Sequence, residues 1–185
     1  MTIVLIGAPG AGKTTVGAEL ARLLGRAFVD VDARIEEVVG KSVSEIFADE
    51  GEAHFRSLEE STTLELLADG EVVSLGGGAV MNPRIRQALA GHDVIWLEVS
   101  IKQASRRVGL NTARPLLLGN VRGRLVELLR ERTPVYEALA TTRIDTDRRE
   151  PREIAVELAD ARRQPGSFPL TVSSPPMRCT SLLAL

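Results

Sequence analysis

Residues 7–14 (GAPGAGKT) match the pattern G-x-x-x-x-G-K-[ST] at every fixed position. The apolar residues Ile3–Ile6 precede this run, and residues 15–24 follow it with apolar side chains at helical spacing. A strand, a glycine-rich loop and a helix in this order bind phosphate, because the loop N–H groups turn inward and the helix N-terminus adds partial positive charge. An ordinary glycine-rich turn would match both the pattern and its flanks only by chance. The sequence therefore predicts a nucleotide site in an α/β fold.

Two residues of this run carry side chains suited to a nucleotide. Lys13 can reach the β- and γ-phosphates, and the Thr14 hydroxyl can bind Mg²⁺. Many phosphate-loop proteins add an aspartate at the end of an apolar strand, whereas residues 72–75 are followed by glycines. We therefore expect Thr14 and Asp30 to serve the ion together with waters, because Mg²⁺ commonly keeps several waters.

Further strand-like apolar runs recur along the chain, with helical patterns between them. Near-continuous apolar strands that alternate with helices indicate a parallel sheet covered by helices on both faces. A length of 185 residues suits one domain, which we place at residues 1–163, and the Pro- and Ser-rich residues 164–185 suggest a disordered tail. The predicted strands are Ile3–Ile6 and residues 27–31, 72–75, 94–99 and, more weakly, 143–146.

Local signals mark several helix boundaries. Ser42 and Glu45 are spaced as a capping box, and Asn82-Pro83 combines an N-cap residue with a proline at the first helical position. Residues 51–67 indicate a longer helix. Its expected inward positions are Phe55, Leu58, Leu64 and Leu67.

The composition is that of a soluble globular protein, with 44% hydrophobic and 26% charged residues. A net charge of −2 argues against nucleic-acid binding, which needs a basic surface. No apolar stretch approaches the roughly 20 residues that span a membrane, and the N-terminal apolar run lacks the basic region of a signal peptide. Cys179 is the single cysteine, so no intrachain disulfide is possible, and we expect a cytoplasmic protein.

Two carboxylates follow the second predicted strand, in Asp30-Val31-Asp32. Ligands of open α/β sheets bind at the carboxyl ends of the strands, and residues i and i+2 of a strand project to the same face. One carboxylate suits a Mg²⁺-bound water, and the other could accept a substrate hydroxyl proton or hold the hydroxyl in line for attack. Alternatively, Asp32 is the N-cap of a helix that begins at Ala33 and Asp30 is solvated, and capping does not exclude catalysis.

Three consecutive glycines, residues 76–78, follow the third predicted strand. They permit close approach of the backbone to a ligand, although an ordinary flexible turn has the same composition. Because a phosphate loop lies nearby in such folds, the ligand interpretation is favoured.

Arginine side chains often hold small anionic substrates through bidentate hydrogen bonds. Arg56 lies in the predicted longer helix, where a surface ion pair with a glutamate three or four positions on is the alternative. Arg114 lies in the loop-rich residues 109–123, where we expect a mobile lid. Arg132 ends the helix that residues 125–132 indicate.

Four further side chains are assigned to packing or structure. His54 and His92 have no partners at metal-ligand spacing, and Trp96 and Tyr136 suit a core.

Taken in order, these segments resemble the shikimate kinase family, of the nucleoside monophosphate kinase structural class. The likeness covers about residues 1–160. Many NTPases share the first motif, but the ordered set is far more specific, and gluconate and adenylate kinases do not resemble it as a whole. The set consists of residues 7–14, Asp30-Val31-Asp32, Phe55-Arg56, 76–80, Arg114-Pro115-Leu116 and 132–136.

The resemblance implies an enzyme that transfers the γ-phosphoryl group of ATP to the 3-hydroxyl of shikimate. The products would be shikimate 3-phosphate and ADP, with Mg²⁺ as cofactor, in aromatic amino-acid biosynthesis. The implied fold is a five-stranded parallel sheet in the order 2-3-1-4-5, with helices on both faces and a lid over the active site. Shikimate and ATP would be the partners, and we expect a monomer without nucleic-acid or membrane partners.

The resemblance also implies a role for individual residues. Asp32 would be the favoured base, Arg56 and Arg132 would clamp the shikimate carboxylate, and Arg107 and Pro151 would flank adenine. The catalytic residues would be Asp32, Lys13 and Arg114, and the Mg²⁺ residues Thr14 and, through water, Asp30. The nucleotide-binding residues would be Gly10, Ala11, Gly12, Lys13, Thr14, Thr15, Arg107, Arg114, Arg149 and Pro151. The shikimate-binding residues would be Asp32, Arg56, Gly77, Gly78, Arg132, Phe47 and Phe55.

Three other functions are weighed against this one. A gluconate-type kinase fits the phosphate loop but is disfavoured by Arg56 and the three glycines. A non-catalytic nucleotide switch need not keep Asp30, Asp32 and the arginines. A nucleic-acid-dependent ATPase lacks the basic patch that it would need.

Overall fold

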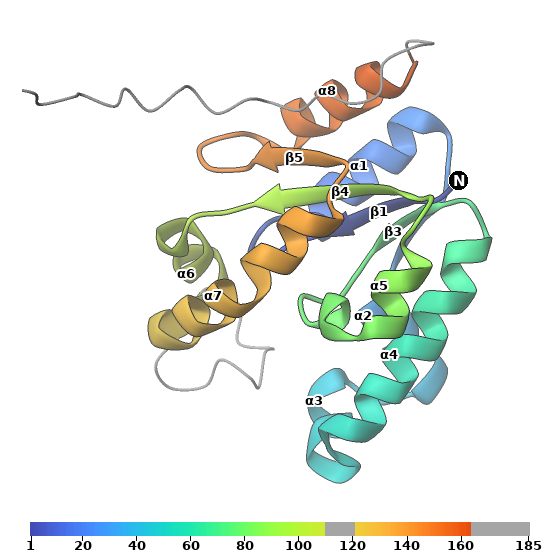
Figure 1. Cartoon of the computed structure of the whole chain (residues 1–185), viewed down its shortest axis with the longest axis vertical. Helices are drawn as coiled ribbons and strands as arrows, with labels where there is room; N and C mark the ends of the chain where they lie inside the picture. Colours follow the sequence, from blue (N-terminus) through green and yellow to red (C-terminus); the bar gives the residue numbers. More distant parts are fainter. Residues whose placement is uncertain (110–120, 164–185) are drawn as a thin grey trace, which may run out of the picture.

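The computed structural model describes residues 1–109 and 121–163 and is built around one parallel sheet with helices on both faces (Figure 1). The strand order β2-β3-β1-β4-β5 confirms the predicted order, and each strand lies within one residue of its predicted run at either end. All four pairings are parallel. The strands are β1 (Ile3–Ile6), β2 (Phe28–Asp30), β3 (Val72–Ser74), β4 (Asp93–Glu98) and β5 (Thr142–Asp145).

Helices connect consecutive strands, as parallel pairing requires. The first part of the chain contains α1 (Lys13–Leu24), α2 (Val31–Val39), α3 (Val43–Asp49) and α4 (Gly51–Ala68). The second part contains the 3₁₀ helix η1 (Ala79–Met81), α5 (Pro83–Ala88), α6 (Ile101–Gly109), α7 (Val121–Leu139) and α8 (Pro151–Arg163).

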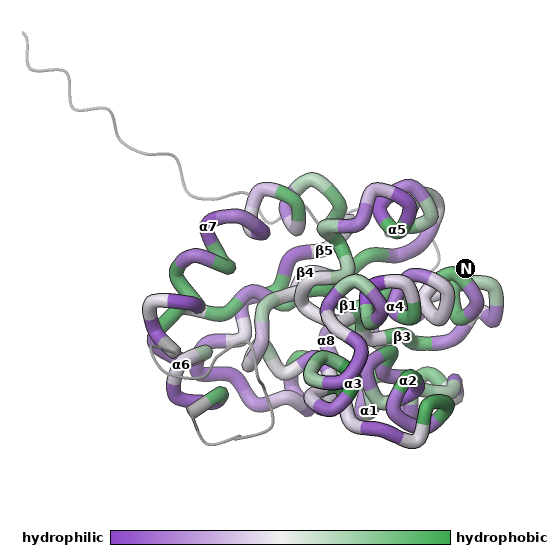
Figure 2. The backbone as a smooth tube through the Cα atoms, turned by 90° about the horizontal axis from the view of Figure 1, so that it is seen from below, coloured by the Kyte–Doolittle hydropathy of each residue, from purple (hydrophilic) through white to green (hydrophobic). Residues whose placement is uncertain are grey.

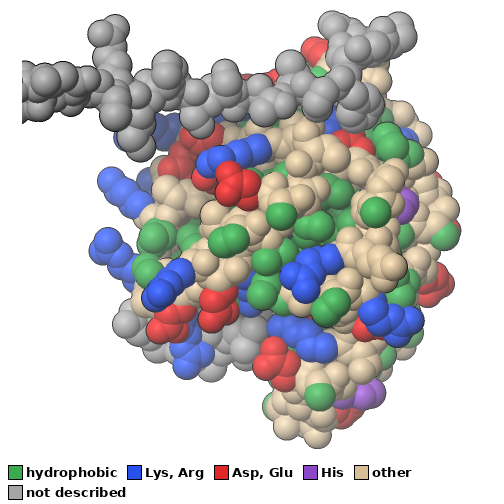
Figure 3. Space-filling model, viewed as in Figure 1, with side chains coloured by type: hydrophobic (Ala, Val, Ile, Leu, Met, Phe, Trp, Pro, Cys, Tyr) green, Lys and Arg blue, Asp and Glu red, His purple; other side chains and the backbone are tan. Residues whose placement is uncertain are grey.

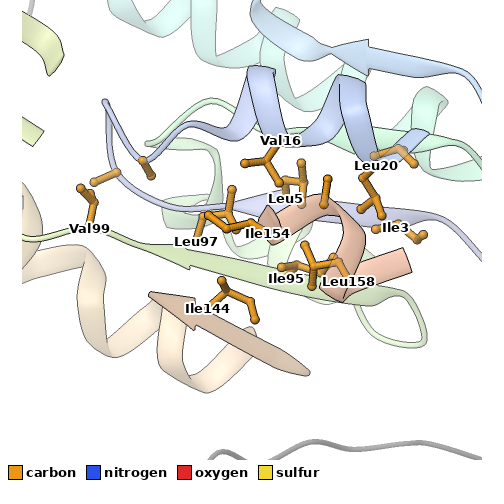
Figure 4. Packing of buried hydrophobic residues seen from close by; sticks show 14 of the residues in the cluster. Ile3, Leu5, Val16, Leu20, Ile95, Leu97, Val99, Ile144, Ile154 and Leu158 are labelled. Carbon is orange, nitrogen blue, oxygen red and sulfur yellow. The ribbon is translucent and has the colours of Figure 1, made fainter. Parts of the chain in front are cut away.

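Both faces of the central strand are buried, because successive side chains of β1 point to opposite sides. Ile3 and Leu5 join a cluster with residues of α1 and α8, which lie side by side on one face (Figure 4). Val4 and Ile6 join a second cluster with residues of α2, α4, α5 and α7 on the other face. In Figure 2 the tube is hydrophobic along β3 and alternates between hydrophobic and hydrophilic along the surrounding helices, as expected of helices that cover a core.

Local sequence signals explain several helix ends. The Ser42 hydroxyl accepts a hydrogen bond from the Glu45 N–H while the Glu45 carboxylate accepts from the Ser42 N–H, which confirms the predicted capping box. The Asn82 side chain caps α5, with Pro83 in its first turn, which is also confirmed.

The buried face of α4 differs in part from the prediction. Phe55 and Leu67 are buried, whereas Leu58 and Leu64 are only half-buried. The polar residues Glu59 and Thr63 and the apolar Leu66 occupy the buried face as well. The prediction counted apolar side chains only, so it missed the polar residues on this buried face.

Helix α7 is longer than predicted and contains Pro134. The predicted end at Arg132 is wrong, although a proline normally breaks a helix by removing a hydrogen bond and crowding the preceding turn. Here the helix continues because the following turn is buried: Tyr136 is 0% exposed, and Leu139 packs against the same cluster. Residues 121–123, expected in a loop, form the first residues of α7.

The rest of the predicted lid, residues 110–120, and the predicted tail, residues 164–185, lie outside the described residues. Within the described ranges, no helix is long and apolar enough to cross a membrane. The face in Figure 3 carries Lys and Arg interspersed with Asp and Glu, so no single-sign patch covers it.

Candidate functional site

The loop between β1 and α1 has the backbone that its glycines allow. Gly7 and Gly10 have φ angles of 144° and 81°. A Cβ at Gly7 would collide with the carbonyl oxygen of Leu97, and one at Gly10 would lie 3.1 Å from that of Ala104. Glycine is therefore required at both positions for the loop to curl against β4 and α6.

The loop ends on Gly12 and leads into α1, whose first residue is Lys13. The ammonium of Lys13 donates to the carbonyl oxygens of Gly7 at 2.9 Å and Ala8 at 3.2 Å, so its side chain folds back over the loop. Lys13 is only 8% exposed. This arrangement places a cation and a helix N-terminus at one point, which suits an anionic phosphate group.

Asp30 lies at the end of β2 and connects this loop to α2. Its carboxylate accepts a hydrogen bond from the Thr14 hydroxyl at 3.0 Å and from the Asp32 N–H at 3.1 Å. Asp30, not Asp32, is therefore the N-cap, and α2 begins at Val31 rather than Ala33. The alternative in which Asp32 caps the helix and Asp30 is merely solvated is wrong, because the strand ends one residue earlier than predicted.

Because α2 begins before Asp32, the reason why Asp32 faces the glycine loop also differs from the prediction. Asp32 lies in the first turn of α2 and not on a strand, so the alternation of strand side chains does not direct it. Its carboxylate instead faces the glycine loop: a Cβ at Gly76 would lie 2.9 Å from Asp32 Oδ1.

A cleft extends from the phosphate loop to α3 and α4, and the sequence-predicted acceptor residues meet there. A Cβ at Gly78 would lie 3.0 Å from the guanidinium of Arg56, and one at Gly77 would lie 3.4 Å from Arg132 Nη1. Asp32, Arg56 and Arg132 thus surround one loop of three glycines, although they come from three different helices. The cleft is lined by Pro9, Asp32, Glu36, Val43, Phe47, Phe55, Arg56, Glu59, Gly76, Gly77, Gly78, Leu128 and Arg132.

Glu59 is a residue of this cleft that the sequence analysis considered only as one of two possible partners of Arg56 in a surface ion pair. It is 2% exposed, and its carboxylate accepts a hydrogen bond from Arg56 Nη1 at 2.7 Å. Burial raises the pKa of Glu59, the Arg56 guanidinium opposes that shift, and the nearby Asp32 charge adds to it. The signal for its burial was present, because Glu59 lies one helical turn after the inward-facing Phe55.

Two aromatic rings form the apolar wall of the cleft. Phe47 of α3 and Phe55 of α4 pack with their ring centroids 4.9 Å apart. Such a wall suits a small ring with one apolar edge.

Tyr136 was predicted to be a packing residue, and it does pack, with its ring centroid 6.0 Å from that of Trp96. Its hydroxyl also donates to the carbonyl oxygen of Gly77 at 2.6 Å. Sequence reasoning missed this contact because Tyr136 and Gly77 are far apart in the chain.

Of the residues predicted on the adenine side, Arg107 and Arg149 have local partners. Arg107 donates to the carbonyl oxygens of Gly10 at 3.1 Å and Thr146 at 3.0 Å, and thus ties the phosphate loop to the end of β5. Arg149 pairs with Glu157 on α8. Arg114 lies outside the described residues. A second surface hollow beside the loop is lined by Thr15, Ala18, Glu19, Arg22, Glu150, Pro151 and Arg152.

The other predicted structural residues have local partners. His54 of α4 lies 2.7 Å from the carboxylate of Glu50, the residue before that helix, and His92 Nδ1 accepts a hydrogen bond from the Thr2 N–H. Among residues 1–109 and 121–163, no group of three or more His, Cys, Asp or Glu is placed to hold a metal ion.

Comparison with known proteins identifies relatives over most of the chain. The family model described as "SKI: Shikimate kinase" matches residues 9–162. A shikimate kinase of Thermobifida fusca is 55% identical over 157 residues, which cover 84% of this chain and 91% of that protein. A shikimate kinase of Mycobacterium tuberculosis is 49% identical over 150 residues, covering 80% of this chain and 85% of that protein.

Solved structures agree with the sequence comparison. Shikimate kinase from Acinetobacter baumannii, in complex with shikimate, superposes with a TM-score of 0.82 at 37% identity, covering 85% of this chain and 89% of that one. A gluconokinase from Sinorhizobium meliloti superposes with a TM-score of 0.51 at 17% identity, covering 86% and 93%. The second likeness extends to the fold alone.

Proposed function

The chain belongs to the shikimate kinase family, and we propose on this premise that the cleft described above is its active site. The protein is an ATP-dependent kinase that transfers the γ-phosphoryl group of ATP to the 3-hydroxyl of shikimate, giving shikimate 3-phosphate and ADP. One observation supports this assignment of the site. Pro9 of the phosphate loop lines the same cleft as Asp32, Arg56 and Arg132.

The phosphate loop binds the nucleotide. Its N–H groups and the N-terminus of α1 surround the phosphates, and Lys13 exchanges its bonds to the Gly7 and Ala8 carbonyl oxygens for bonds to the β- and γ-phosphates. This exchange needs no large movement, because the lysine already lies over the loop. Arg107, which bonds to the Gly10 carbonyl oxygen, supports the loop from the side of β5.

Thr14 and Asp30 fit the requirements of a Mg²⁺ ion. Their oxygen atoms are hydrogen-bonded at 3.0 Å, and hydroxyl and carboxylate oxygens are the ligands that Mg²⁺ prefers beside phosphate and water. When bound, the ion neutralises charge on the phosphates. Asp30 also caps α2, so one carboxylate links the ion site to the helix that carries Asp32.

The acceptor end of the cleft suits a small ring that carries hydroxyl groups and one carboxylate. Arg56 and Arg132 provide two guanidinium groups for the carboxylate, and Asp32 accepts hydrogen bonds from ring hydroxyls. Phosphoryl transfer asks a protein mainly to position reactants and neutralise charge. Asp32 therefore holds the attacking hydroxyl in line and receives its proton, and the Gly77 and Gly78 backbone supports the ring.

Several assignments that rest on the resemblance stay predictions. We propose that residues 1–163 form the kinase domain, that Arg114 stabilises the transferring phosphoryl group, and that Pro151 and Arg149 contact the nucleotide. We further propose a cytoplasmic monomer, which gel filtration with light scattering can test.

A coupled assay of ADP release tests the function with shikimate, gluconate and AMP as alternative acceptors. We expect saturable ADP release with shikimate alone, and its loss in the Lys13→Met variant. A folded protein that binds ATP and releases no ADP when shikimate is added would overturn the proposal.

A further inference from the structure

Tyr136 holds the glycine loop from its buried side. The residue is 0% exposed on α7, and its hydroxyl donates to the Gly77 carbonyl oxygen at 2.6 Å. Its ring packs against Trp96 of β4. The ring therefore has a fixed place in the core, and the hydroxyl has a fixed place against the loop.

This bond determines the direction of the next N–H group. In a trans peptide the carbonyl and the N–H point in opposite directions. Because the Gly77 carbonyl faces Tyr136, the Gly78 N–H points away from it. Within residues 1–109 and 121–163, the Gly78 N–H has no acceptor in the protein.

The surroundings of Gly78 are those of the acceptor end of the cleft. A Cβ on this residue would lie 3.0 Å from both terminal nitrogens of Arg56. Arg132, which precedes Tyr136 by about one helical turn, borders Gly77 in the same loop. Helix α7 thus contributes one side chain to the cleft and a second one to the back of the loop.

We propose that Tyr136 is a positioning residue for the acceptor: its hydroxyl holds the Gly77–Gly78 peptide so that the Gly78 N–H donates a hydrogen bond to shikimate. The inference rests on the proposed function. In this role Tyr136 touches no substrate and acts through the peptide, although Arg132 of the same helix also bonds to its hydroxyl.

The ionisation of Tyr136 is consistent with a permanent donor. Burial raises the pKa of Tyr136 to about 12, although the nearby Arg132 guanidinium opposes the shift. The hydroxyl therefore keeps its proton at neutral pH and can donate to the Gly77 carbonyl oxygen.

The Tyr136→Phe variant tests this role, because it keeps the ring and removes only the hydroxyl. We expect the KM and Kd for shikimate to rise about 5- to 10-fold, the range for one lost hydrogen bond, with the Kd for ATP unchanged and kcat lowered less than KM is raised. Thr2→Val is the matched control. The Thr2 hydroxyl is also buried and also donates to a backbone carbonyl at 2.6 Å, that of Leu67, but it lies outside the cleft. This control should lose comparable thermal stability and keep the parent KM for shikimate.

Three results would overturn the inference. One is a parent KM for shikimate in active Tyr136→Phe protein, and another is a rise shared by ATP or by the Thr2→Val control. The third comes from the Arg132→Lys background: if Tyr136→Phe changes the Kd for shikimate there by no further factor, the hydroxyl acts through Arg132 and not through the peptide.

A second measurement is independent of the folding of the variant. Titration of the parent chain with shikimate should shift the amide ¹H and ¹⁵N resonances of Gly78, and an unmoved resonance at saturation contradicts the inference. Absence of shikimate-dependent turnover in the parent chain would instead overturn the proposed function, so the two failures are distinguishable.

Discussion

Asp30 and Asp32 are two positions apart, yet the backbone gives them separate tasks. Asp30 ends β2, caps α2 and accepts a bond from Thr14, so both of its oxygens are engaged. Asp32 begins the first helical turn, and its carboxylate faces the glycine loop. The division arises because the strand ends at Asp30, which turns the next side chains out of the plane of the sheet.

The first prediction concerns Asp32. Replacing it by Asn keeps the size of the side chain but removes the carboxylate that we propose accepts the hydroxyl proton, so kcat should fall by about 100-fold or more while the KM for shikimate changes far less. Steady-state kinetics measure both. The control is Glu37→Gln, an exposed carboxylate of the same helix, which should keep the parent kcat. An unchanged kcat in Asp32→Asn would remove Asp32 as the base.

The second prediction concerns the buried Glu59. Burial raises the pKa of Glu59 above the ordinary value of 4.5, so the folded state binds the proton more tightly than the unfolded state does. This contribution to stability is fully present below pH 4.5 and is lost as the pH rises through the raised pKa. The Glu59→Gln variant lacks this titration.

Thermal unfolding of both proteins at several pH values checks this linkage. The Tm of the parent chain minus that of Glu59→Gln should become smaller as the pH rises from about 4 to about 7, whereas groups common to both proteins cancel. A difference that stays constant or grows over this interval contradicts the raised pKa.

At the scale of elements, the ends of the helices decide what the cleft contains. Helix α7 continues past Pro134, and only this continuation brings Tyr136 to the glycine loop. Helix α4 passes from the exposed surface to the core. The turn that carries Arg56 and Glu59 lies at the boundary, with Arg56 partly exposed and Glu59 buried. The side of such a helix that faces the sheet is apolar where it covers the core and polar where it borders the cleft.

The attachment of α8 gives the third prediction. Arg162 of α8 binds Asp93 of β4 through two nitrogens, one at 2.9 Å, and their side chains are only 10% and 1% exposed. Removing one partner of a buried pair leaves the other charge buried without a counter-charge. Arg162→Ala should therefore lower the free energy of unfolding by about 3–5 kcal/mol in urea titrations.

The control for this variant is Arg34→Ala, which breaks the exposed pair with Glu37 and should cost less than about 1 kcal/mol. Both variants should keep the parent kcat at temperatures where they are folded, because neither side chain lines the cleft. Equal losses of stability in the two variants would show that burial of the α8 pair does not matter.

At the scale of the whole molecule, the order of the strands assembles the site. In the order β2-β3-β1 the three strands are neighbours and parallel, so their carboxyl ends meet at one edge of the sheet. The phosphate loop, Asp30 and residues 76–78 follow these three strands. Pro9 of the phosphate loop and residues from distant helices therefore line one cleft.

The fourth prediction concerns how much the binding of shikimate in the cleft raises the free energy of unfolding. Shikimate at about 100 times its Kd should raise the free energy of unfolding by about 2.7 kcal/mol. Arg56→Ala loses a charged hydrogen bond worth about 1.5–3 kcal/mol. The stabilisation at the same shikimate concentration should therefore fall to about 0.3–1.3 kcal/mol. Thermal shift measurements with and without shikimate check this, and undiminished stabilisation in Arg56→Ala would exclude Arg56 as a ligand of the carboxylate.

Much of this protein could be read from its sequence, because the determinants are local. Residues 7–14 with their flanks, the apolar strands and the caps at Ser42 and Asn82 depend on backbone preference and on neighbours a few positions away. The strand count, the parallel sheet and the residues around the glycine loop were predicted on that basis and from the family resemblance.

The tertiary structure alone decided which polar groups meet. Whether Asp30 or Asp32 caps α2, whether Glu59 is exposed or buried beside Asp32, and which carbonyl Tyr136 binds all depend on segments brought together by packing. Hydrophobic periodicity places apolar side chains on a buried face but does not say which polar residue on that face finds a charged or hydrogen-bonding partner. That choice depends on distances between elements, and only the folded chain defines these distances.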